Sequence, residues 1–180
     1  SRRRAGSVVL FAGQPPAGLN GMAYMLTATH YDQDQAIPLE NDHEAIRWLQ
    51  DNVQDSPVIM EANTYPKIYG WGNRMTVYTG LPSVVGWEWH TRQHRAGFEG
   101  ATEEVRRRAN DVIAFYNTPD VHQAMNILSS YDVQYLVVGG LERAYYSPVG
   151  LEKFDLMVEL GMLEQVFQNP GTQIYRVVGS

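Results

Sequence analysis

The 180-residue sequence has no cysteine, only two lysines, no excess of positive charge and no long apolar run. Without cysteine, disulfides, thiol catalysis and cysteine-ligated zinc are excluded. The net charge of −6 argues against a general nucleic-acid binder, which needs a positive face for the phosphates. No apolar segment approaches the roughly 18 residues of a membrane span. No signal peptide is indicated either, and we expect the chain to be part of a longer protein.

Motifs of several enzyme classes are also missing. There is no GxSxG elbow, no phosphate-binding P-loop and no GxGxxG fingerprint. His90 and His94 have the spacing of two metal ligands on a helix, but Thr91 stands where an HExxH motif needs glutamate. Glu88 or Glu99 could supply a third ligand. We interpret the two histidines as exposed side chains and expect no metal and no cofactor.

The hydrophobic pattern predicts alternating helices and strands. A helix beginning at Asn41 or Asp42 places Ile46, Leu49 and Val53 on one face. Further helices are predicted over residues 102–116, 119–130 and 151–162, the second with Pro119 in its first turn. Strands are predicted at 57–61, 75–78, 83–85 and 133–140, followed by a hairpin over 163–178 that turns at Asn169-Pro170-Gly171.

This order predicts an α/β fold, a three-layer Rossmann-like domain. Its mixed sheet is expected to have about five strands, with parallel central strands and a C-terminal antiparallel hairpin. Residues 1–40 show weak periodicity and are interpreted as an entry segment. Residues 41–180 are interpreted as a single α/β domain.

Two carboxylates are candidates for chemistry because each follows a predicted parallel strand. Glu61 ends the strand at 57–61, and Glu142 follows "YLVVGG". Functional groups of α/β domains gather at the carboxyl ends of such strands, so the two could form an acid/base pair. They could equally form ion pairs with Arg74, Arg95 or Arg143, which is the commoner role of such groups.

Aromatic side chains are concentrated between residues 65 and 89. Their rings could stack on sugars, lie at a membrane interface or simply pack in the core. We expect at least half of them to be buried. The set comprises Trp71, Trp87, Trp89, Tyr65, Tyr69 and Tyr78.

Several longer segments resemble a known family. These are "LNGMAYM", "NDHEAIRWLQDNVQDSPVIMEA", "YGWGNRMTVYTGLPSVVGWEWHTRQHR", "YDVQYLVVGGLERAYY", "GLEKF" and "TQIYRVV". The sequence resembles the C-terminal extracytoplasmic part of the bacterial and archaeal YYY-domain membrane proteins, which look like GT-C glycosyltransferases acting on lipid-linked sugars. The family has an acidic residue where this chain has Thr91, which argues against an acid/base role there. The arrangement "IRWLQDNV", "PVIMEA", "YGWGNR" is also similar to the soluble domain of oligosaccharyltransferase catalytic subunits.

The resemblance implies that residues 41–180 form a domain on the extracytoplasmic side of the cell membrane and that residues 1–40 are its juxtamembrane segment. It would recognise an acceptor or glycan, or cover the active site in the membrane, and would be inactive alone. Its partners would be its own transmembrane region and a glycan or polyprenyl-phosphate sugar, and not nucleic acid. Two alternatives remain, a purely structural domain that packs on its own membrane helices, and an independent hydrolase using Glu61 and Glu142.

The resemblance also assigns roles to candidate residues. A sugar or glycan would contact Trp71, Arg74, Trp87 and His90. Arg95 and Arg143 would orient a phosphate or carboxylate, or pin Glu61 and Glu142. Tyr145 and Tyr146 would extend the same surface. For each of them, the alternative role is to anchor the long loop over residues 63–100.

Overall fold

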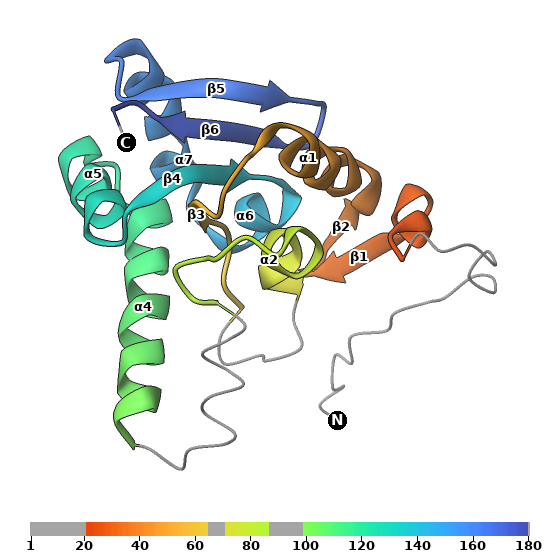
Figure 1. Cartoon of the computed structure of the whole chain (residues 1–180), viewed down its shortest axis with the longest axis horizontal. Coiled ribbons are helices and arrows are strands. Elements are labelled where there is room, and N and C mark those ends of the chain that lie inside the picture. The colour runs from red at the N-terminus through yellow and green to blue at the C-terminus, as the bar shows by residue number, and fades with distance from the viewer. Residues whose placement is uncertain (1–20, 65–70, 87–98, 180) are drawn as a thin grey trace.

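A four-stranded mixed sheet forms the centre of the computed structural model, which describes residues 21–64, 71–86 and 99–179 (Figure 1). In spatial order its strands are β3 (Val58–Met60), β4 (Val133–Val138), β6 (Gln173–Val177) and β5 (Leu163–Gln168). β3 is parallel to β4, whereas β6 is antiparallel to both β4 and β5. The predicted α/β class, mixed sheet and C-terminal hairpin are therefore confirmed, with four strands in this sheet. The expectation of parallel central strands is wrong, because the central pair β4 and β6 is antiparallel and the parallel pair includes the edge strand β3.

The predicted helices are present, with some shifted ends. α1 begins directly after Pro38, and α5 begins after Asp120, whose side chain accepts the backbone N–H groups of His122 and Gln123. Pro119 thus precedes the helix and does not lie in its first turn. The helical segments are η1 (Ala23–Leu26), α1 (Leu39–Asn52), η2 (Trp71–Asn73), α2 (Arg74–Thr79), α4 (Glu99–Asn117), α5 (Val121–Ser130), α6 (Gly140–Tyr145) and α7 (Pro148–Glu159).

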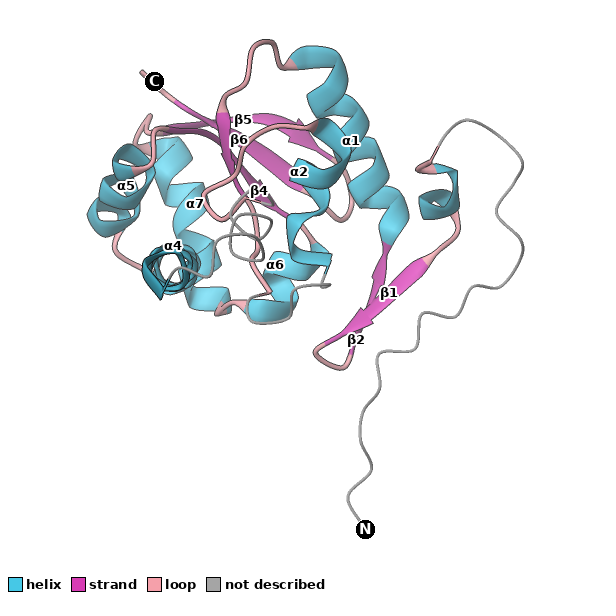
Figure 2. Cartoon of the chain, turned by 60° about the horizontal axis from the view of Figure 1, so that its bottom comes forward, coloured by secondary structure: helices cyan, strands magenta, loops and turns pink. Residues whose placement is uncertain are grey.

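The alternation of side chains along the strands divides the core into two layers. Val137 of β4 packs in a cluster with buried residues of α1, α2 and η1, whereas its neighbours Leu136 and Val138 pack with α4, α5, α6 and α7. Helices thus cover both faces of the sheet, as Figures 1 and 2 show. This arrangement is the three-layer architecture expected when successive side chains of buried strands point to opposite faces.

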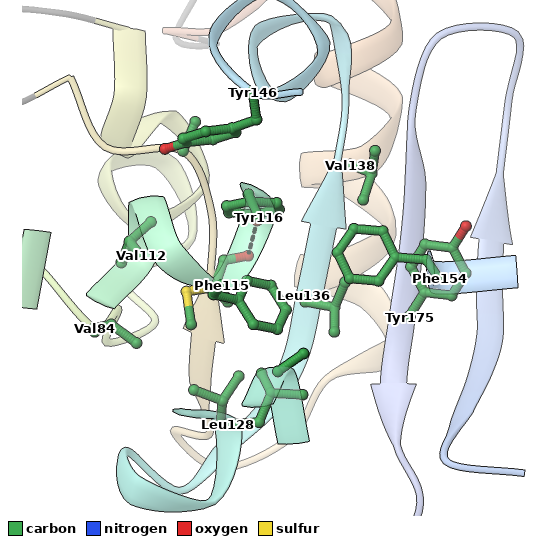
Figure 3. Packing of buried hydrophobic residues seen from close by; sticks show 14 of the residues in the cluster. Val84, Val112, Phe115, Tyr116, Leu128, Leu136, Val138, Tyr146, Phe154 and Tyr175 are labelled. Atoms are coloured by element: carbon green, nitrogen blue, oxygen red, sulfur yellow. Dashed lines mark hydrogen bonds between the residues drawn. The ribbon is translucent and has the colours of Figure 1, made fainter. Parts of the chain in front are cut away.

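The cluster beneath α4 and α7 is dominated by aromatic rings (Figure 3). Phe154 of α7 lies between Phe115 of α4 and Tyr175 of β6, with ring centroids 5.6 and 5.8 Å away. Tyr116 stacks on Tyr146 at 4.6 Å, and its hydroxyl donates to the backbone oxygen of Val137 at 2.8 Å. This contact fixes the last turn of α4 against the sheet.

The strand predicted at residues 75–78 is wrong, because these residues form α2. Val77 and Tyr78 favour a strand by local propensity. Two features outside this local pattern override the strand propensity. The Glu61 side chain accepts the backbone N–H groups of Met75 and Thr76 at the start of α2, and Gly80 ends the helix with φ of 75°.

Two further segments border the sheet. Of the strand predicted at 83–85, a single parallel bridge from Ser83 to Ile59 is present. Before α1, β1 (Thr29–Asp32) and β2 (Gln35–Pro38) form a separate antiparallel ribbon, whose Ile37 enters the main core. Across the described ranges, no helix combines the length and the apolar character needed to span a membrane.

Candidate functional site

The centre of the candidate site is the buried guanidinium of Arg74, which bridges two carboxylates. Its Nε donates to Oδ2 of Asp42 at 2.6 Å, while Nη1 and Nη2 donate to the two carboxylate oxygens of Glu142 at 3.1 and 2.8 Å. The side chains of Arg74, Asp42 and Glu142 are each no more than 1% exposed. A planar guanidinium is suited to this paired geometry, which a lysine could not reproduce.

Each member comes from a different helix. Asp42 lies in the first turn of α1, Arg74 begins α2 and Glu142 lies in α6, directly after β4. Glu142 also accepts the backbone N–H groups of Gly139 and Ala62, both at 2.8 Å, and so joins the carboxyl ends of β4 and β3. The network therefore fastens three helices to adjacent parallel strands.

Electrostatics keep Glu142 ionised despite its burial. Burial by itself would raise the pKa of Glu142, but the charge and hydrogen bonds of Arg74 and the two amides outweigh burial and lower it below its ordinary value. Burial likewise opposes the charge of Arg74, but Asp42 and Glu142 raise its pKa well above the usual value. The pair is therefore charged in the folded protein.

Glu61 lies beside this network in a different protonation state. Its oxygens accept the amides of Met75 at 2.9 Å and Thr76 at 3.4 Å. Burial raises the pKa of Glu61 to about 8; Arg74 and the two amides oppose this rise, and the charge of Glu142 adds to it. Glu61 is thus mainly protonated at neutral pH, whereas Glu142 is ionised. The two strand-end carboxyl groups predicted from the sequence do share one site.

Trp71 reaches the network through Asp42. Its Nε1 donates to Oδ2 of Asp42 at 3.1 Å, and its half-buried ring lies between those of His30 and Tyr78, each 6.1 Å away. On the other side, the hydroxyl of Thr172 donates to Oδ1 of Asp42 at 3.3 Å. Asp42 therefore connects an aromatic group to the turn of the C-terminal hairpin.

Arg143 and Tyr146 have roles that differ from the predicted ones. The guanidinium of Arg143 donates to the backbone oxygen of Gly171 at 2.6 Å and to Gln173 at 2.7 Å, so it fixes the hairpin turn. The hypothesis that it pins Glu142 is wrong, because Arg74 holds that carboxylate. Tyr146 is buried against Tyr116, and its hydroxyl accepts the N–H of Asn63 at 3.2 Å. Tyr146 is thus a core residue, while Tyr145 donates to Asp32 of the ribbon at 2.6 Å.

The remaining candidates fall outside the described residues. These are Trp87, His90 and Arg95, together with Trp89, His94, Tyr65 and Tyr69. Within the described part of the chain, no group of three or more histidine, aspartate and glutamate side chains could hold a metal ion.

Sequence reasoning missed Asp42 and Thr172. Asp42 was expected only as a helix cap, yet it is buried on the same side of α1 as Ala45, Ile46 and Leu49. The spacing of three, four and seven residues from Asp42 to these apolar residues was the available signal. A charged residue on an apolar stripe needs a buried partner, and Arg74 is that partner. Thr172 carried no comparable signal.

A cavity of about 140 Å³ lies next to this network. It is bounded by β2, the first turn of α1, the start of α6 and the β5–β6 turn. Asp42, Thr172 and Arg143 line it, whereas Glu61 and Glu142 do not. The predicted acid/base pair therefore does not open into this cavity.

Comparisons with known proteins find similarity among solved structures. No protein-family model and no curated protein matches the sequence. Among solved structures, the chain is similar to the C-terminal globular domain of oligosaccharyltransferase from Archaeoglobus fulgidus. The match covers 75% of this chain and 95% of that one, with 16% identity and a TM-score of 0.46.

Proposed function

We propose that this chain is a non-catalytic extracytoplasmic domain of a membrane-embedded GT-C-like glycosyltransferase. In this proposal the domain recognises an acceptor or glycan, or covers the active site in the membrane. The sequence motifs shared with the YYY-domain proteins support the membrane-enzyme context. The geometry supports the non-catalytic role.

The observation that carries the non-catalytic role is that the buried carboxyl groups already have structural partners. Asp42 and Glu142 are ion-paired with Arg74, and Glu61 accepts two amides of α2. A general acid or base must come within hydrogen-bond reach of its substrate. Glu61 and Glu142 are 3% and 0% exposed, so a substrate cannot approach either without displacing the core. Their opposite protonation states, which would suit an acid/base pair, are explained here by burial and Arg74.

Trp71 is the described residue best placed to report on a glycan. Its indole N–H is fixed by Asp42, and part of its ring is accessible. A rigid ring beside a buried anchor offers a preorganised stacking surface for a sugar.

The test is an NMR titration of the 180-residue chain with glycans and polyprenyl-phosphate sugar analogues. We expect the Trp71 indole signal to move in a saturable way. Trp48 of α1 provides a matched control, because its ring packs on Phe167 of β5. Its signal should stay fixed. Failure of Trp71 to respond to any member of the panel would refute recognition at this surface. Turnover of a glycoside by the chain, lost in Glu61→Gln, would instead establish the hydrolase alternative.

One observation favours the second candidate, a structural domain that packs on its own membrane helices. Tyr24 of η1 hydrogen-bonds Tyr78 of α2, and these neighbouring elements expose Leu26 (50%) and Val77 (58%). Exposed apolar residues on neighbouring elements are suited to a contact surface. Charged substitutions at Leu26 and Val77 should then reduce activity of the full-length membrane protein and leave glycan binding at Trp71 unchanged.

A further inference from the structure

We infer that the cavity between β2, α1, α6 and the β5–β6 turn is a subsite for one uncharged sugar unit. This inference rests on the proposed role in glycan recognition, and it adds a second contact point on the far side of Asp42 from Trp71. Three features of the cavity lead to it: its polar groups, its charge balance and its size.

Two side-chain amides that line the cavity have hydrogen-bonding capacity to spare. Thr172 and Asp42 form its floor, and Arg143 lies at its rim, held in place by Gly171 and Gln173. The side-chain amides of Gln35 and Asn41 also line it, and neither makes a hydrogen bond to another described residue. Amide and guanidinium groups can pair with adjacent hydroxyls, which act as donor and acceptor together.

The charges near the cavity cancel. Asp42 and Glu142 are balanced by Arg74 in the buried network and by Arg143 at the rim. Since Glu61 is mainly protonated at neutral pH, the site offers no net charge to an ion. A neutral ligand with several hydroxyls therefore fits this arrangement better than a phosphate or a carboxylate does.

Apolar side chains provide the complementary wall. Ile37 and Pro38 of the ribbon also line the cavity, as expected for a ligand with one C–H face. Gly140 allows the ribbon to approach this closely, because a Cβ there would lie 2.7 Å from Cγ2 of Ile37. The volume of about 140 Å³ has room for about one sugar ring.

The experiment is an HSQC titration of the 15N-labelled 180-residue chain with neutral hexoses and N-acetylhexosamines up to about 100 mM. We expect saturable shifts of the Gly140 and Gly171 amides with at least one sugar. Ala36→Trp, which places a large ring at the exposed edge of the cavity, should abolish them. Gln35→Ala should weaken binding about tenfold, and Gln54→Ala, at an exposed site after α1, should leave it unchanged.

Several outcomes would overturn the inference. One is the absence of shifts at Gly140 and Gly171 across the panel, and another is binding that persists unchanged in Ala36→Trp, with circular dichroism showing that this variant is folded. A third is a sugar phosphate or uronate that binds more than about tenfold tighter than its neutral parent, which would contradict the charge argument. A response of Trp71 with no response at Gly140 and Gly171 would refute the subsite and leave the proposed function standing.

Discussion

Replacing Arg74 by methionine tests the network most directly. Methionine keeps much of the side-chain length but removes the charge and all four hydrogen bonds from the guanidinium to Asp42 and Glu142. Two carboxylates would then lie unpaired in the core, with only backbone amides, Trp71 and Thr172 as donors. Breaking a buried ion pair in this way costs about 3–5 kcal/mol. We expect Arg74→Met to lose that much free energy of unfolding at pH 7.

The pH dependence and a compensating variant make the prediction specific. Urea denaturation followed by circular dichroism at pH 7 and pH 5 should show a smaller loss at the lower pH, because stranded carboxylates with raised pKa values can protonate there. The triple variant with Asp42→Asn, Arg74→Met and Glu142→Gln removes the charges together and should regain more than half of the loss. A loss below about 1 kcal/mol in Arg74→Met, or one that is equal at both pH values, would refute the reasoning.

Three other substitutions test separate parts of the fold. Glu61 has a folded pKa of about 8 against an ordinary value of 4.5, so its contribution to stability is complete below pH 4.5 and is lost as the pH rises through 8. This difference in pKa corresponds to about 5 kcal/mol of unfolding free energy. Glu61→Gln should remove the decline in stability that urea denaturation measures between pH 4.5 and 8.5. Burial lowers the pKa of Lys153 to about 7. Above pH 7 the unfolded chain therefore binds more protons than the folded chain, so the contribution of Lys153 to stability rises from pH 7 towards 10.5. Lys153→Met should abolish that rise. A variant whose stability has the wild-type pH dependence would contradict this prediction. Asp120→Ala removes the α5 cap and should cost about 1 kcal/mol in thermal unfolding, with a neutral result refuting the role of the cap.

The sequence predicted those elements whose signals are local. The C-terminal hairpin follows from two strand-like runs around a turn of Asn, Pro and Gly, and the structure pairs Gln168 with Gln173 across that turn. β4 follows from a nearly continuous apolar run, which is typical of a strand covered on both faces. α1 follows from its apolar stripe, although this stripe also includes the buried Asp42, for which the sequence predicts the role of a helix cap.

Elements that depend on distant partners were not predictable in the same way. Residues 74–79 have strand-like side chains, and they become helical because Glu61, thirteen residues before Arg74, caps their first turn. The β1–β2 ribbon has no strong alternation, and it is held by Ile37 in the core and by Tyr145 on Asp32. In the site, the meeting of Glu61 and Glu142 followed from strand order. The choice of Arg74 over Arg143 as the partner of Glu142 depended on the fold of α2.

The geometry of the network argues for positioning as its main role. A buried ion pair is weak support for stability, since well-packed apolar residues of similar volume often serve as well or better. Apolar residues could not reproduce the directional hydrogen bonds of this network. The guanidinium of Arg74 fixes Asp42 on one side, and the two oxygens of Asp42 then fix the Trp71 ring and the Thr172 turn on opposite sides. If positioning is the reason for the charges, the triple neutral variant should recover stability but lose the fixed environment of the Trp71 indole. Full recovery of both would show that the charges are dispensable for this role.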